Sequence, residues 1–212
     1  DAEKAVNAYN TLKDWGMQLS LGSVTSKPCE ATAAENYSDR IFALTPSASS
    51  VAVTEGKDNV FQMCFMDPNQ GTASAQYIAE QKLGTKVAII WKNDDVYSKG
   101  IYQTFTEKAK ELKLEIVSET TFADGNDTDF SVQITDAKDK GADLIITASD
   151  FKDNLVEVAN EYPDIAFTII SEDVIDQCEN NNAYGVDFAT SQAAFLGGIA
   201  AADIAANGAE GM

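Results

Sequence analysis

The apolar run at residues 86–91, Lys-Val-Ala-Ile-Ile-Trp, constrains the fold of this chain more than any other segment. A strand that is covered on both faces has such a sequence, because neither side of it meets water. Two further β-branched runs, DLIIT at 143–147 and IAFTII at 165–170, alternate with stretches of helical period. This alternation predicts an α/β fold with parallel sheets flanked by helices.

The rest of the chain continues the same alternation. We expect helices over 1–15, 31–39, 72–81, 99–112, 128–140, 150–161 and 191–206, and further strands over 17–22, 41–45, 61–65, 114–118 and 185–189. The pair Gly197-Gly198 inside the last helix indicates close helix packing. A new series of β-α units starts at Lys86, after the segment KLGT. We therefore expect two α/β units, residues 1–85 and residues 86–212.

The composition argues against several classes of function. The 212 residues include no His, which removes Ser-His-Asp and Cys-His catalysis and the HExxH zinc helix. Lys and Arg number 15 against 34 Asp and Glu, so the net charge of −19 disfavours nucleic acid and anionic membrane surfaces as partners. The three cysteines lack CxxC spacing, and the acidic loop 124–129 lacks the Gly and Glu of a calcium loop. We expect no metal, no cofactor and no enzymatic activity, with a carboxylate-based enzyme as a distant alternative.

Two serine-rich turns follow predicted strands, SVTSKPC at 23–29 and TPSASS at 45–50. A strand that leads through such a turn into a helix exposes backbone N–H groups and hydroxyls, which can bind a carboxylate. The same residue types also act as ordinary helix caps, so their spacing leaves both interpretations open. Tyr97 follows the strand at 86–91, at the end of a parallel strand where open α/β sheets place ligands, although a surface tyrosine fits equally well.

Taken together, longer motifs resemble a known family. The motifs are SVTSKPCEATAAE, DRIFALTPSASSVAVTEGKDNVFQMCFMDPNQGTASAQYIAE, KVAIIWKNDDVYSKGIYQTF and DTDFSVQITDAKDKGADLI, all within residues 1–146. They are similar to the leucine/isoleucine/valine-type amino-acid-binding proteins, which are extracytoplasmic receptors of ABC importers with the two-lobed type I periplasmic-binding-protein fold. The resemblance implies a branched-chain amino acid bound between the lobes, hinge closure and a membrane permease as partner.

A second resemblance covers residues 142–207. DLIITASDFKDNLVEVANEYPDIAFTII and GVDFATSQAAFLGGIAAADIA are similar to the basic-membrane-protein family of nucleoside-binding lipoproteins. The chain therefore resembles a splice of two related receptors near residues 142–150. A nucleoside receptor is the first alternative function, and an engineered scaffold without ligand is another.

The first resemblance also implies a set of ligand-binding residues. Ser26 matches the serine that holds the ligand carboxylate, Tyr97 matches the tyrosine that closes over the ligand, and the TPSAS stretch matches main-chain and hydroxyl groups on the carboxylate and ammonium. That stretch contributes Ser47, Ala48 and Ser49, while the acidic partner of the ammonium is expected near Glu172 or Asp173. Asp150, in the loop after the strand at 143–147, is also expected to bind the ligand.

The cysteines of two matching motifs, Cys29 in KPCE and Cys64 in QMCF, are expected to form a disulfide, with Cys178 free. A disulfide implies a periplasmic or extracellular location, and the lipoprotein resemblance adds a lipid anchor. The chain opens on a polar helix, so we expect that any signal peptide has been removed or was never present.

Two departures from the family predict weak binding. The family's opening strand–helix–strand unit is absent ahead of the first helix, so we expect an incomplete first lobe whose open sheet edge favours pairing with a second copy. The family's second-lobe tyrosine is replaced by Ser149, Asp150 and Phe151. A zwitterion left partly uncompensated loses several kcal/mol of binding free energy, so we expect dissociation constants in the millimolar range.

Overall fold

The computed structural model describes residues 1–126, 128–170, 178–186 and 190–207. The chain divides into two compact units, of which the first contains Asp1–Asp67 and Ala189–Met212 and the second contains Pro68–Phe188. The division falls at 67/68, whereas the sequence suggested 85/86, and it returns the last helix to the first unit. Both units have helices packed on parallel sheets, so the predicted α/β fold is confirmed.

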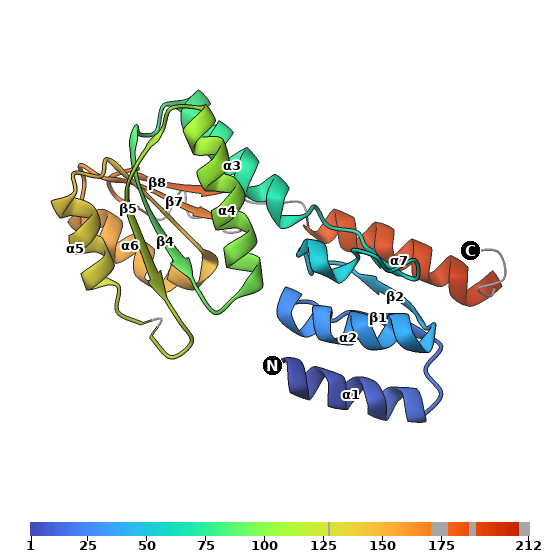
Figure 1. Ribbon diagram of the computed structural model, residues 1–212. Helices are drawn as coiled ribbons and strands as arrows, with labels where there is room; N and C mark the ends of the chain where they lie inside the picture. The colour runs from blue at the N-terminus through green and yellow to red at the C-terminus, as the bar shows by residue number, and fades with distance from the viewer. Residues whose placement is uncertain (127, 171–177, 187–189, 208–212) are drawn as a thin grey trace. The chain divides into compact units, whose positions relative to one another are not determined.

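The first unit is built on a three-stranded sheet of order β1-β2-β3, in which both strand pairs are parallel. Its elements are α1 (Ala2–Asp14), β1 (Leu19–Leu21), α2 (Ser26–Asp39), β2 (Phe42–Thr45), η1 (Val51–Val53), β3 (Val60–Gln62) and α7 (Thr190–Asn207). Side chains alternate across β2, so that Ala43 packs with Cys29 and Ala33 of α2. Phe42 and Leu44 pack with α7 instead. The sheet therefore lies between α2 and α7 (Figure 1).

Gly197 explains how closely α7 approaches its sheet. A Cβ atom at this position would lie 3.1 Å from the side chain of Met63 and 3.5 Å from that of Leu44. This agrees with the close packing expected there, whereas Gly198 faces open space.

The second unit contains a five-stranded parallel sheet of order β5-β4-β6-β7-β8. Its elements are α3 (Asp67–Gln81), β4 (Lys86–Lys92), α4 (Val96–Glu111), β5 (Glu115–Phe122), α5 (Ser131–Asp139), β6 (Leu144–Thr147), η2 (Ser149–Phe151), α6 (Lys152–Glu161), β7 (Ala166–Ile170) and β8 (Ala183–Val186). Helices α3 and α4 cover one face, and α5 and α6 cover the other (Figure 1). Val87 and Ile89 face the first pair, while Ala88 and Ile90 face the second, as the apolar run at 86–91 predicted.

This strand order creates a switch point. The chain leaves β4 toward β5 on one side, and β6 pairs with β4 on the other. Connections that depart in opposite directions leave a crevice at the carboxyl ends of the two strands, which is where open α/β sheets bind ligands.

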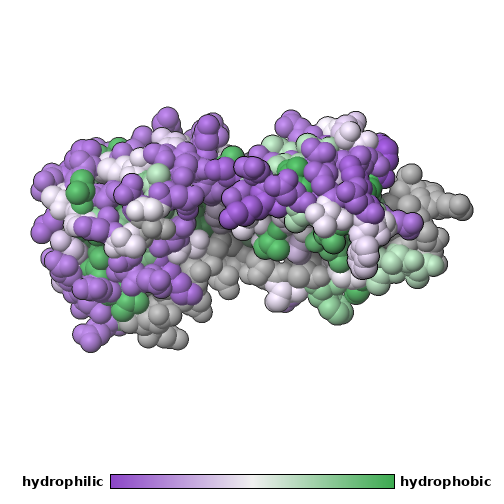
Figure 2. All heavy atoms as spheres, turned by 90° about the horizontal axis from the view of Figure 1, so that it is seen from below, coloured by the Kyte–Doolittle hydropathy of each residue, from purple (hydrophilic) through white to green (hydrophobic). Residues whose placement is uncertain are grey.

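Two further findings concern the surface. On the face drawn in Figure 2, hydrophilic residues dominate and hydrophobic ones form small separate patches. Within the described residues, the helices are all too short or too polar to cross a membrane.

Candidate functional site

Ser26, the first residue of α2, organises the loop that follows β2. Its side-chain oxygen accepts hydrogen bonds from the backbone N–H groups of Ser49 and Ser50, both at 3.2 Å. The residue is 4% exposed, and its hydroxyl still carries a proton that it can donate. The structure thus brings together Ser26 and Ser49, which the sequence resemblance had placed in one site.

Thr45, at the end of β2, holds the other half of this loop. Its hydroxyl oxygen accepts from the N–H groups of Ala48 at 3.0 Å and Ser47 at 3.4 Å, and it donates to the carbonyl of Ser23 at 2.8 Å. Four successive loop N–H groups, from residue 47 to residue 50, therefore point to hydroxyls of this unit. Sequence reasoning assigned Ser47, Ala48 and Ser49 to a ligand and missed Thr45, although its place at a strand end before a serine run is the signal of such a turn.

The loop lies beside the start of a helix. Helix α2 begins after Thr25, whose side chain makes no capping hydrogen bond to any described residue. The first turn of a helix carries a partial positive charge, which attracts an anion. We name Ser26 and residues 47–49 the serine cradle; it combines the hydroxyl of Ser26 with this charge.

The predicted disulfide between Cys29 and Cys64 is wrong. All three cysteines, including Cys178, are free. The Cys29 thiol is buried and hydrogen-bonded to Thr45 and to the backbone of Ser23, while the Cys64 thiol donates to the carbonyl of Ala48 at 3.4 Å. Burial raises the pKa of Cys64 to about 11 and also raises the pKa of Cys29, so neither thiol ionises near neutral pH.

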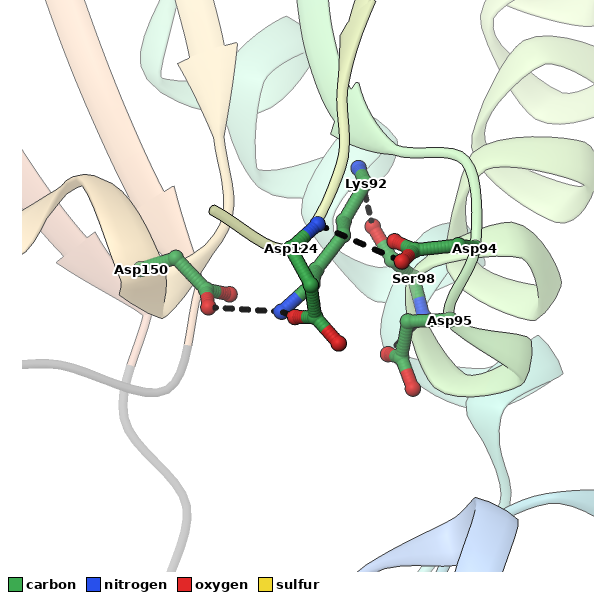
Figure 3. A network of polar contacts seen from close by, with 6 residues as sticks. All are labelled: Lys92, Asp94, Asp95, Ser98, Asp124 and Asp150. Atoms are coloured by element: carbon green, nitrogen blue, oxygen red, sulfur yellow. Dashed lines mark hydrogen bonds and ion pairs between the residues drawn. The ribbon is translucent and has the colours of Figure 1, made fainter. Parts of the chain in front are cut away.

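In the second unit, three strand ends meet at one lysine (Figure 3). Lys92 ends β4, and its Nζ lies 2.5 Å from Oδ1 of Asp124, which follows β5, and 3.3 Å from Oδ1 of Asp150 in η2. Burial alone would lower the pKa of Lys92, but the hydrogen bond to Asp124 and the charge of Asp150 raise it above its usual value. Asp150, predicted to bind ligand, therefore already pairs with a cation.

The turn after β4 is fixed by short polar contacts. The N–H of Lys92 donates to Ser98 Oγ at 3.0 Å, and the N–H of Ser98 donates to the N-cap residue Asp95 at 3.0 Å. The N–H of Asp124 reaches Oδ2 of Asp94 at 3.2 Å (Figure 3). Asp124 and Asp150 thus pair with Lys92, while Asp94 and Asp95 accept hydrogen bonds from backbone N–H groups at the same carboxyl edge of β4.

A small apolar cavity of about 30 Å³ lies between α4 and the sheet, at the switch point. Its aromatic lining consists of Trp91, Tyr97, Tyr102 and Phe105, and the rings of Trp91 and Tyr102 stack at 4.4 Å. Tyr97 donates its hydroxyl proton to Oε1 of Gln70 at 2.9 Å. Tyr97 therefore faces the cavity, as a ligand-facing residue would.

The other predicted residues have different positions. Phe151, where the family has a tyrosine nearby, is fully buried and packs on Phe130 in the core. Glu172 and Asp173 lie outside the described residues. Within the part of the chain that the structure describes, no three acidic, Cys or His side chains gather into a metal site.

Comparisons with known proteins assign this architecture. Residues 1–164 match the family model described as "Periplasmic binding protein". The Leu/Ile/Val-binding protein of Citrobacter freundii is 25% identical over 150 residues, which are 68% of this chain and 39% of that protein. The match to the family runs through residues 142–150, where the sequence suggested a change of resemblance. These comparisons support the resemblance to amino-acid receptors, and they do not show the one to nucleoside-binding lipoproteins.

Solved structures show the same fold. The branched-chain amino-acid substrate-binding protein LivJ of Streptococcus pneumoniae, in complex with isoleucine, has a TM-score of 0.70 and 26% identity, covering 81% of this chain and 49% of that one. A solute-binding protein of Rhodopseudomonas palustris, in complex with p-hydroxybenzoic acid, has a TM-score of 0.71 at 18% identity over 81% of this chain and 48% of its own. The chain spans about 39% of the length of the curated relatives that it matches.

Proposed function

This chain belongs to the periplasmic binding protein family, and from that premise we propose that it serves an ABC importer as a non-catalytic, extracytoplasmic receptor for a branched-chain or related amino acid. The observation that carries the proposal is the serine cradle, in which Ser26 keeps a donor proton at the start of α2 while its oxygen fixes the loop. A membrane permease is the proposed partner, and a lipid anchor is a proposed means of retention at the membrane.

The cradle suits the carboxylate of an amino acid. A hydrogen bond from a hydroxyl to a carboxylate is charge-assisted, and the partial charge of the first turn of α2 adds to it. The loop that carries the cradle is held by Ser26 and Thr45 before any ligand arrives, so binding does not have to order it.

The carboxyl edge of β4 in the second unit carries groups that suit an ammonium and an apolar body. The carboxylates of Asp94, Asp95, Asp124 and Asp150 lie at this edge, and they favour an ammonium group over a second carboxylate. The adjacent cavity of about 30 Å³ is lined mainly by Ile and aromatic side chains, which favours contact with an apolar group at its mouth.

An aromatic acid is the second candidate. The stacked pair of Trp91 and Tyr102 favours it, because aromatic rings pack well against other rings. The negative edge opposes it, since an aromatic acid without an amino group has nothing to offer to the aspartates. A nucleoside, which the second resemblance implied, lacks the carboxylate that the cradle would bind.

The experiment is a titration of the chain with four groups of compounds: leucine, isoleucine and valine; p-hydroxybenzoate; adenosine and guanosine; and glutamate as a charge control. Thermal shift gives the first ranking, because a ligand that binds only the folded state raises stability by mass action. Calorimetry up to tens of millimolar then gives dissociation constants, which the sequence places in the millimolar range. A constant of about 1 μM would overturn that weak-binding expectation but not the function.

Variants locate the site. We expect Ser26→Ala to weaken isoleucine binding by about 10-fold or more, because it removes a hydrogen bond to a charged group. Thr45→Val is the matched control: it removes an equivalent loop contact but no proposed ligand donor, so its affinity loss should be much smaller. Equal isoleucine affinity of wild type and Ser26→Ala would contradict the proposed site. Preferred binding of a nucleoside would contradict the proposed ligand class.

A further inference from the structure

The hydrogen bond between Tyr97 and Gln70 joins the N-terminal ends of helices α4 and α3. Tyr97 lies in the first turn of α4, and Gln70 lies in the first turns of α3. Gln70 is 1% exposed, which is unusual for a glutamine. A buried amide is retained where its hydrogen bonds serve a purpose, because an unsatisfied one is costly.

The residue after Gln70 fixes the distance between these helices. A Cβ atom on Gly71 would lie 2.4 Å from the carbonyl oxygen of Ile101 and 2.7 Å from the nitrogen of Phe105, both in α4. The backbones of α3 and α4 therefore touch at Gly71, and the amide of Gln70 is held at a set distance from the ring of Tyr97. The backbone near Tyr97 is itself fixed by the Asp95 cap.

We propose that Gln70 is a positioning residue for ligand binding: it fixes the ring of Tyr97 at the cavity and accepts the hydrogen bond of its phenolic O–H. The inference rests on the proposed function, because it concerns the same ligand. Gln70 itself need not touch the ligand; it acts through Tyr97.

The direction of this hydrogen bond determines what Tyr97 can offer. Because the O–H donates to Gln70 Oε1, the phenolic oxygen meets any further partner as an acceptor. An acceptor suits a ligand ammonium and not a carboxylate. Gln70 thereby selects for the amino group, which separates amino acids from plain carboxylic acids.

Four variants test this inference. Gln70→Met keeps the volume but loses the amide, Gln70→Glu keeps an acceptor for the phenol, and Tyr97→Phe removes the donor. Ile78→Val is the matched control, because Ile78 is a buried core residue on the same helix that lies far along it from Gln70. Each is titrated with isoleucine and with 3-methylpentanoate, which is isoleucine without its ammonium.

We expect Gln70→Met to weaken isoleucine binding about 10-fold, Gln70→Glu less than about 3-fold, and Ile78→Val not at all. The loss should vanish for 3-methylpentanoate, and Gln70→Met should add nothing in the Tyr97→Phe background. An equal loss for both compounds, or an additive double variant, would overturn the positioning role and leave the proposed function intact. A large loss of isoleucine affinity in Gln70→Glu would also overturn the positioning role, because it would mean that Tyr97 donates its hydrogen bond to the ligand.

A second readout does not depend on ligand. Gln70→Met and Tyr97→Phe form a double-mutant cycle on the unfolding equilibrium of the second unit. A direct contact between the two side chains gives a coupling of at least about 3-fold in the unfolding equilibrium constant. If the wild type binds no amino acid, both the proposed function and the role of Gln70 in binding fail. Coupling in the cycle would then support only the contact by which Gln70 positions Tyr97. Absence of coupling would overturn the positioning of Tyr97 whatever the ligand result.

Discussion

Replacing Gly71 with alanine is expected to destabilise the second unit by about 2 kcal/mol, as the sum of two opposing effects. The new methyl group would lie 2.4 Å from the carbonyl oxygen of Ile101 and 2.2 Å from the hydroxyl of Thr104. The threonine side chain can rotate, but the carbonyl belongs to the backbone of α4. Ordinary contact needs about 3.5 Å, so α3 and α4 must separate by about 1 Å.

That separation loosens the core between the helices, where Ala75, Ile78 and Phe105 are almost fully buried. Forced overpacking of this kind costs about 1–3 kcal/mol, and the backbone contact places Gly71 at the upper end. Alanine is a better helix former than glycine by about 1 kcal/mol, which offsets part of the loss. The remainder is the figure of about 2 kcal/mol.

Tryptophan fluorescence provides the assay. The chain contains two tryptophans, of which Trp15 is 86% exposed in the first unit and Trp91 packs against Tyr102 in the second. In a Trp15→Phe background, urea unfolding followed at Trp91 should show a midpoint lowered by about 1 M. Gly198→Ala is the control, because a methyl group there meets open space and should leave this transition unchanged. An unchanged midpoint for Gly71→Ala would refute the helix contact.

Three further outcomes are expected. Lys92→Met should cost about 1 kcal/mol, as for a partly exposed ion pair, and the deficit in urea unfolding should stay constant up to about pH 10. The folded state raises the pKa of Lys92, so this stabilisation is present below the unfolded pKa and is lost as pH rises through the folded one; a deficit that shrinks near neutral pH would contradict this. Thiol titration of the denatured, unreduced protein should find three thiols, whereas one would mean that a disulfide forms after all. We expect the edge strand β1 to support self-association, measured by light scattering, and Leu21→Lys to reduce it, because Leu21 is 62% exposed on that strand; unchanged association would contradict this.

Much of the fold could be predicted because its strands are short apolar runs. Strand β4 extends over Lys86–Lys92, one residue beyond the expected run. Helix starts were less accurate, since they depend on which polar side chain caps the first turn. Helix α4 begins at Val96 because Asp95 caps it, and α5 begins at Ser131, where Asp129 accepts its N–H, instead of at residue 128.

The candidate site could be predicted only in part. The resemblance selected Ser26 and Tyr97; the first holds the loop after β2 and the second lines the cavity, while their roles in binding stay predictions. It could not show that Lys92 would pair with Asp150, because these residues are 58 positions apart and meet only when β4 and β6 pair. The cysteine pairing failed for the same reason: shared motifs do not determine where two thiols point.

The motif Asp-Pro-Asn-Gln-Gly at residues 67–71, which is part of the family resemblance, makes specific contacts in the structure. The N–H of Asp67 donates to the carbonyl of Ser49 at 2.9 Å, which ties the start of α3 to the loop of the serine cradle. Three residues later Gln70 accepts a hydrogen bond from the Tyr97 hydroxyl, and Gly71 allows the backbone of α4 to approach. The motif therefore makes one contact to the cradle loop in the first unit and two contacts to α4 in the second. These contacts give a physical reason for the motif, because Ser49 of the cradle loop and Tyr97 of α4 are both proposed to bind the ligand.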